Sequence, residues 1–103
     1  MDEFIKLAME ILGADNIELI APNELEKTVP DMLSDDYKNR FKAEYKQLLI
    51  RYQRLCMFLR KIDAGTAKHT CPVSLLKQQH KLMGDYLNVL VERAYYEGVN
   101  LND

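Results

Sequence analysis

Residues 71–101 read CPVSLLKQQHKLMGDYLNVLVERAYYEGVNL, and this stretch decides the fold. Pro72 suits the first position of a helix, where no backbone N–H is needed. Glu97 and Gly98 form the stop signal, after which we expect Val99 to fold back on Ala94 in a Schellman closure. Between these signals runs one broad apolar face that predicts a long helix: Leu75, Leu76, Gln79, Leu82, Met83, Tyr86, Leu87, Leu90 and Ala94.

A second long helix is predicted just upstream, over about residues 35–63. Ser34 and the two aspartates after it suit its amino end, and Gly65 suits its carboxyl end. Apolar residues recur at alternating steps of four and three, the spacing of a seam packed on a partner helix: Tyr37, Phe41, Tyr45, Leu48, Tyr52, Leu55, Leu59 and Ile62. The connection at residues 66–70 is short, so the two helices must run antiparallel.

The amino-terminal third is predicted to be a separate acidic segment. Residues 3–12 indicate a short amphipathic helix, and residues 16–20 a loop or a marginal strand. The connector 21–30, bracketed by prolines, is expected to hold one turn of helix at most. The predicted fold class is therefore all-α: residues 1–34 supply a short helix and connector, and residues 35–103 a long antiparallel hairpin.

Both apolar stripes are wider than one partner helix requires. Two helices alone cannot bury faces on several sides. Either the amino-terminal helix covers the hairpin or hairpins from several subunits associate; we expect both, and hence a homo-oligomeric helical bundle. The residues predicted to form the core and interface are Phe41, Tyr45, Leu48, Tyr52, Leu55, Leu59, Leu76, Gln79, Met83, Tyr86 and Leu90.

Composition indicates one folded domain. The 103 residues are 48% hydrophobic and 29% charged, which is ordinary for a globular chain. No apolar run approaches the roughly 20 residues that span a bilayer, and acids stand where a signal peptide carries positive charge. We therefore expect a soluble cytoplasmic protein without membrane contact, with Cys56 and Cys71 as reduced thiols.

Charge is unevenly distributed along the chain. The net charge of −2 argues against general affinity for DNA or RNA. Residues 1–34 carry two lysines against eight acids, whereas residues 35–63 carry eight cations against four acids. Two interpretations follow: the acidic segment packs against the basic helix, or the basic helix attracts an anionic ligand.

The sequence lacks the familiar motifs of enzymes and of metal sites. The chain has no GxGxxG, GxxxxGK[ST], HExxH or nucleophile elbow. His69 and Cys71, with His80 as a distant third, lack the close pairs of a zinc site. A nucleophile pair of Cys71 and His69 lacks an orienting third group. We expect no enzyme, no metal and no cofactor.

Anion binding is the more serious candidate, at one of two places. Arg60, Lys61, Lys68, His69 and Lys77 surround the predicted turn beside the amino end of the last helix. The alternative is that Arg60 and Lys61 serve only the helix dipole and solubility.

At the other end of the hairpin, antiparallel packing can bring Arg40, Arg93 and Tyr96 together. Such a set can stack a base and grip a phosphate, or can form an ordinary interface. Gln79 and Arg93 are polar exceptions on the apolar face, where such residues often set register or oligomeric state.

The hairpin resembles a family of small proteins of tailed phages and prophages named after a crAss-like phage gene product. The resemblance covers roughly residues 37–101 and rests on Cys71, Pro72, Leu75, Leu76, Gln79, Met83, Tyr86, Leu87, Arg93, Ala94, Glu97, Gly98 and Val99. The architecture is also similar to the helical-hairpin sponges with which phages sequester nucleotide signals of bacterial immunity. Those proteins oligomerise and bind cyclic nucleotides between subunits.

These resemblances, with the basic second helix, lead to a functional hypothesis. We expect a non-enzymatic phage or prophage protein that oligomerises and counters host defence by sequestering a cyclic nucleotide. The alternative is an interaction module that binds a host or phage protein through exposed helix faces.

Overall fold

The computed structural model describes residues 24–102. Its elements are α2 (Glu24–Lys27), α3 (Val29–Met32), α4 (Tyr37–Asp63) and α5 (Val73–Glu97). Across these residues the chain is helical with no strand, and α4 and α5 form the predicted antiparallel hairpin. The helix predicted at residues 3–12 and the marginal strand at 16–20 lie outside the described residues.

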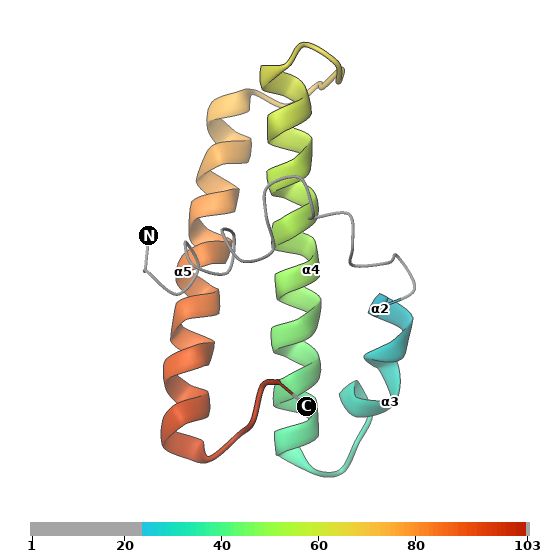
Figure 1. The fold of residues 1–103 in the computed structure, drawn as a ribbon, viewed down its shortest axis with the longest axis vertical. Helices are drawn as coiled ribbons and strands as arrows, with labels where there is room; N and C mark the ends of the chain where they lie inside the picture. The colour runs from blue at the N-terminus through green and yellow to red at the C-terminus, as the bar shows by residue number, and fades with distance from the viewer. Residues whose placement is uncertain (1–23, 103) are drawn as a thin grey trace.

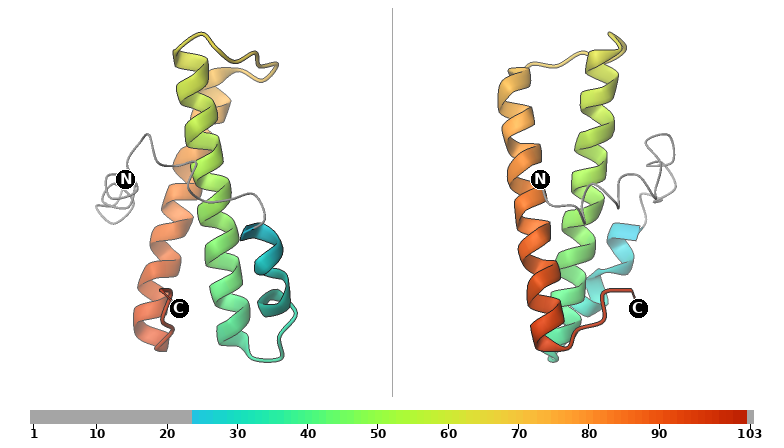
Figure 2. Two further views of the ribbon diagram at one scale, coloured as in Figure 1. Left: turned by 45° about the vertical axis from the view of Figure 1, so that its right-hand side comes forward. Right: turned by 60° about the vertical axis from the view of Figure 1, so that its left-hand side comes forward.

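Helix α4 is the central element. Figure 1 shows it between α5 on one side and α2 with α3 on the other, and both views of Figure 2 keep this order. It buries Phe41, Tyr45 and Tyr52 toward α5, where they join Leu87, Leu90, Ala94 and Val99 in the core. It also buries Ala43 and Ile50, which lie roughly half a turn from that seam at about 100° per residue. Burial on two faces explains why its apolar stripe is wider than one partner requires.

The start of α4 differs from the prediction. Asp36, rather than Ser34, is the N-cap, and its carboxylate accepts from the Lys38 N–H at 2.9 Å. The Ser34 hydroxyl instead accepts from the Asp36 N–H at 3.1 Å and from the Asn39 side chain at 3.2 Å. Ser34 therefore holds the turn that precedes the helix, because the helix begins two residues later than a Ser34 cap requires.

The predicted start of α5 was wrong by one residue. Pro72 is its N-cap, and the Pro72 carbonyl accepts from the N–H groups of Leu75 and Leu76 at 3.1 and 3.2 Å. The first helical residue is Val73. Pro72 still fits, because an N-cap also needs no N–H donor inside the helix.

Both predicted glycine stops are confirmed. Gly65 and Gly98 have φ of 74° and 68°, a left-handed conformation that costs glycine little. The Val99 N–H donates to the Ala94 carbonyl at 2.9 Å, and the Val99 side chain is buried. This is the expected Schellman closure, and it returns the chain onto the hairpin core.

The described part of the connector, residues 24–30, contains one complete turn of helix, α2, as expected. A second single turn, α3, begins at Val29 and lies half beyond Pro30, where no helix was predicted. Thr28 joins the two turns: it is 3% exposed, its hydroxyl donates to the Leu25 carbonyl at 2.6 Å, and it accepts from Gln47 Nε2 at 2.7 Å. Because α2 and α3 contact α4, the described part of the acidic segment does pack on the basic helix.

Candidate functional site

The hairpin turn is a structured loop with an exposed surface. Thr66 closes α4 by donating its N–H and its hydroxyl to the Lys61 carbonyl, at 2.9 and 3.1 Å. His69 Nδ1 lies 2.8 Å from the Cys71 carbonyl, so its N–H can donate there and leave Nε2 to the outside. These contacts hold the loop beside the first turn of α5, where unpaired N–H groups and the positive dipole end favour anions.

Positive charge gathers at this turn. Residues 54–80 carry Arg54, Arg60, Lys61, Lys68 and Lys77 against a single acid, Asp63. All five cations are exposed, as is His69. The structure therefore brings together the predicted set Arg60, Lys61, Lys68, His69 and Lys77 at one end of the molecule.

The second predicted set occupies the open end of the hairpin, where its arginines already have partners. Arg93 forms an ion pair with Glu97, with Nε 2.7 Å from Oε2, and its guanidinium lies 4.7 Å from the centre of the Phe41 ring. The side-chain hydrogen bond to Arg93 lowers the pKa of Glu97, and the same bond raises that of Arg93. Arg40 donates to the Ser34 carbonyl at 2.7 Å.

Tyr96 lies at this end with most of its surface accessible. It is 84% exposed and meets the ring of Tyr95 edge to face, with centroids 5.3 Å apart. Tyr95 is 83% exposed. An exposed pair of aromatic rings suits contact with another molecule, but no described contact joins Tyr96 to Arg40 or Arg93.

Sequence reasoning missed a stacked pair at mid-hairpin. The rings of Tyr52 and His80 are 4.2 Å apart with an angle of 14° between their planes. Gly84 lies against this pair: a Cβ built there would be in van der Waals contact with Tyr52, 3.4 Å from Cε1. Burial, with the nearby Cys56 and Asp85, raises the pKa of Tyr52 to about 12, and burial lowers that of His80. The sequence does contain a signal for this position of His80: residues 76, 80 and 83 follow one another at steps of four and three, the spacing of one helix face.

Several polar atoms inside the described part have no hydrogen-bond partner. They include the amide oxygen and nitrogen of Gln53, a side chain that is 2% exposed. His80 Nε2 and Asn88 Oδ1 also belong to this group. Cys56 and Cys71 are thiols rather than a disulfide, and burial raises the pKa of Cys56. Among residues 24–102 no three His, Cys, Asp or Glu side chains gather as a metal site would require.

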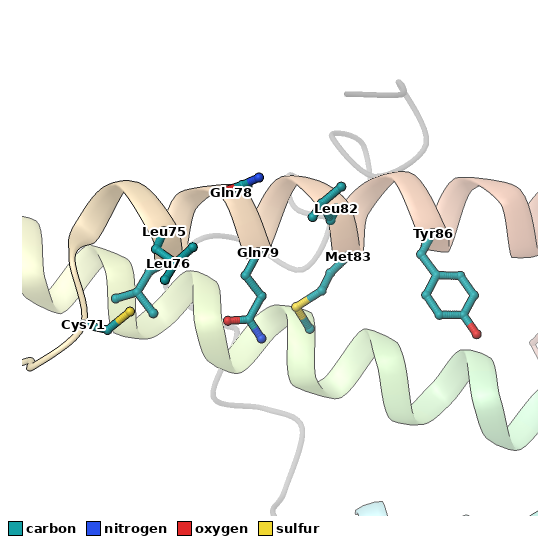
Figure 3. A pocket seen from close by; sticks show the side chains of 8 residues that line it. All are labelled: Cys71, Leu75, Leu76, Gln78, Gln79, Leu82, Met83 and Tyr86. Atoms are coloured by element: carbon teal, nitrogen blue, oxygen red, sulfur yellow. The ribbon is translucent and has the colours of Figure 1, made fainter.

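A groove runs along α5 on the side of the hairpin drawn in Figure 3. Its volume is about 480 Å³. Figure 3 shows Gln79, Met83 and Tyr86 directed toward α4, while Gln78 and Leu82 point away from it. The Tyr86 hydroxyl donates to the Glu44 carboxylate of α4. The lining is apolar apart from two amides and this phenol: Cys71, Leu75, Leu76, Gln78, Gln79, Leu82, Met83 and Tyr86.

The predicted core residues divide between buried and exposed positions. Phe41, Tyr45, Tyr52, Leu59 and Leu90 are buried. Leu48, Leu55, Leu76 and Met83 are half-buried, whereas Gln79 and Tyr86 are exposed.

None of the described helices is long and apolar enough to cross a membrane.

Comparison with known proteins places the hairpin in a family. No curated protein and no solved structure matches the chain. The Sequestin family model matches residues 35–96, which take in α4, the turn and nearly all of α5. Since this match spans more than half of the sequence, the chain belongs to the Sequestin family.

Proposed function

We propose that this protein sequesters an anionic cyclic nucleotide, using the basic turn of its hairpin, without transforming it. The family name denotes sequestration, a binding rather than a catalytic role. The observation that carries the proposal is the gathering of five exposed cations and one acid at residues 54–80. Phosphate groups suit such a surface, because charge-assisted hydrogen bonds are the strong ones.

The biological setting is part of the same proposal. A phage or prophage would gain from such a protein by removing a nucleotide signal of host defence. Sequestration needs only tight, stoichiometric binding, so a site without a nucleophile or a metal is sufficient. Association of hairpins would place the sites of several subunits in one particle.

Calorimetry with a panel of cyclic dinucleotides, cyclic trinucleotides and cyclic ADP-ribose isomers tests this proposal. We expect one class to bind, and a Lys61→Glu/Lys68→Glu double variant to bind it roughly tenfold or more weakly, since one charge-assisted hydrogen bond contributes about 1.5 kcal/mol or more. Lys46→Glu is the matched control, because Lys46 is exposed on α4 away from the turn. Absence of binding across the panel, or equal loss in the control, would refute the proposal.

A second function is favoured by a different observation. The exposed pair Tyr95 and Tyr96 suits capture of a protein, since aromatic residues are enriched at the centres of interfaces. Under this alternative a host or phage protein co-purifies with the tagged chain from infected cells, and a Tyr95→Ala/Tyr96→Ala variant loses it. A nucleotide sponge needs no such partner.

A further inference from the structure

Helix α5 carries two parallel seams. The inner seam faces α4 and consists of Leu76, His80, Met83, Leu87, Leu90 and Ala94, all buried or half-buried. The outer seam lies one residue earlier and consists of Leu75, Gln79, Leu82, Tyr86, Val89, Arg93 and Tyr96, all exposed. Each follows alternating steps of four and three, the spacing of a helix packed on another helix. The inner seam packs on α4, whereas the outer seam meets α4 through Tyr86, whose hydroxyl donates to Glu44, and through Arg93, whose guanidinium lies over the Phe41 ring.

The outer seam is apolar where a helix face on the surface would be expected to be polar. Leu75, Leu82 and Val89 each expose more than half of their surface, at 53%, 57% and 55%. They stand one heptad apart on one line of the helix, unlike the singly scattered apolar residues of ordinary surfaces. The groove of Figure 3 lies between the two seams and offers holes for the side chains of a facing helix.

Charge complementarity indicates what covers this seam. The turn end, residues 54–80, carries five cations and one acid. The open end, residues 24–44 with 89–102, carries five cations and eight acids. Two copies placed antiparallel would set each turn end against the open end of the other, and would also oppose their helix dipoles. Parallel copies would set the two basic ends together.

We propose that the outer seam of α5 is the interface of a homodimer in which two copies pair antiparallel about a two-fold axis. The contact continues the hairpin interface, so that four long helices form one bundle. Tyr86 is the middle member of the seam and lies at the axis. Leu82 of one copy then faces Val89 of the other, Gln79 faces Arg93, and Leu75 faces Tyr96.

This proposal deepens the oligomerisation included in the proposed function but requires no nucleotide. A two-fold interface is self-complementary, so one seam suffices for both subunits. In this register the two polar residues of the seam, Gln79 and Arg93, can bond to each other between subunits: the Gln79 amide oxygen can accept from the Arg93 guanidinium of the second copy. A single polar pair in an apolar seam selects one register over its neighbours.

Paired charge substitutions test both the interface and its direction. Light scattering and sedimentation of the full chain should show a dimer. Leu82→Lys and Val89→Glu, each alone, should weaken it roughly tenfold or more, because each places a charge against an apolar partner. An equimolar mixture of the two variants should recover dimers, since antiparallel pairing sets the new lysine against the new glutamate.

Tyr95→Lys is the matched control, because Tyr95 is 83% exposed and lies on neither seam. Circular dichroism of each variant checks that the hairpin is intact. Three results would overturn the proposal: a wild-type monomer at micromolar concentration, loss of the dimer in Tyr95→Lys alone, or no recovery in the mixture.

Cysteine crosslinking reads the two-fold axis directly. In a Cys56→Ala/Cys71→Ser background, Tyr86→Cys should form an intersubunit disulfide under mild oxidation, because only residues near the axis meet their own copies. Leu75→Cys should not, and a parallel dimer would link both, contrary to the proposal. Nucleotide binding is a separate readout: a dimer that binds no nucleotide refutes only the proposed function, and a monomer that binds one refutes only the interface.

Discussion

The stacked rings of Tyr52 and His80 are one of the contacts between the two long helices, since Tyr52 lies on α4 and His80 on α5. Stacking sets the imidazole against an aromatic face and removes much of its water, so the neutral form is favoured. Such a contact depends on the rotation of both helices about their axes, which no local pattern specifies. By contrast, the left-handed residues Gly65 and Gly98 could be predicted, since a helix stop is a local requirement.

The stability of the hairpin is predicted to fall on mild acidification because of His80. Its pKa is lowered by burial from the usual 6.5, so below pH 6.5 the unfolded chain binds a proton that the folded chain does not. The free energy of unfolding therefore decreases as the pH falls from 6.5 toward the folded pKa. Urea unfolding between about pH 5 and 7.5 measures this slope.

A matched pair of variants isolates the effect. His80→Phe keeps a ring beside Tyr52 and should flatten the slope, whereas His69→Gln, at an exposed turn position, should leave it. An unchanged slope in His80→Phe would assign the acid sensitivity to other groups.

At the scale of elements, the sequence is sufficient to predict the hairpin but not what lies against its sides. Two long helices predicted from their apolar periodicity and joined by a short turn can pack only as an antiparallel hairpin. The packing of α2 and α3 on α4 includes the hydrogen bond between Gln47 and Thr28, which joins residues 19 apart. Nothing in the sequence of the connector predicts this contact. The breadth of the α5 face was predicted, but its division into a buried and an exposed seam depends on how α5 is rotated toward α4.

The close approach of α4 and α5 at Gly84 yields a second prediction. Gly84→Leu should lower the free energy of unfolding by about 1–3 kcal/mol, because the larger side chain displaces the Tyr52 ring. Gly84→Ala should change it by less than about 1 kcal/mol: its Cβ would lie 3.4 Å from Tyr52 Cε1, and any crowding is offset by better helix propensity. Equal effects of the two substitutions in denaturant titrations would contradict this account.

At the scale of the whole molecule, the described residues 24–102 are electrically polarised along the length of the hairpin. The turn end, residues 54–80, carries five cations and one acid, and the open end, residues 24–44 with 89–102, carries five cations and eight acids. The basic cluster could be predicted, because residues flanking a short turn must lie together. The predicted set at the open end lies where the antiparallel packing requires, yet Arg93 is paired with Glu97 and Arg40 with a carbonyl. The Arg93–Glu97 pair has the i, i+4 spacing of helix neighbours and could have been predicted from the sequence, whereas the contact of Arg40 with the Ser34 carbonyl depends on the path of the turn before α4.

This polarity makes salt a test of how two copies meet. If the subunits pair antiparallel, raising NaCl from about 0.05 to about 0.5 M should weaken self-association severalfold, since the Debye length falls below roughly 5 Å and screens the attraction. Parallel pairing would respond in the opposite sense, because screening would relieve repulsion between the basic ends. Sedimentation velocity across the salt series distinguishes the two.

In the proposed dimer, the offset of one residue between the seams of α5 would make folding and assembly genetically separable. A scan of polar substitutions through this helix should yield two periodic profiles, one in melting temperature and one in particle mass, each repeating every seven residues and displaced by a single position. A one-residue insertion in α5 would shift both profiles at once. In such a dimer, selection would be able to change how the subunits associate without altering the fold, one outward residue at a time.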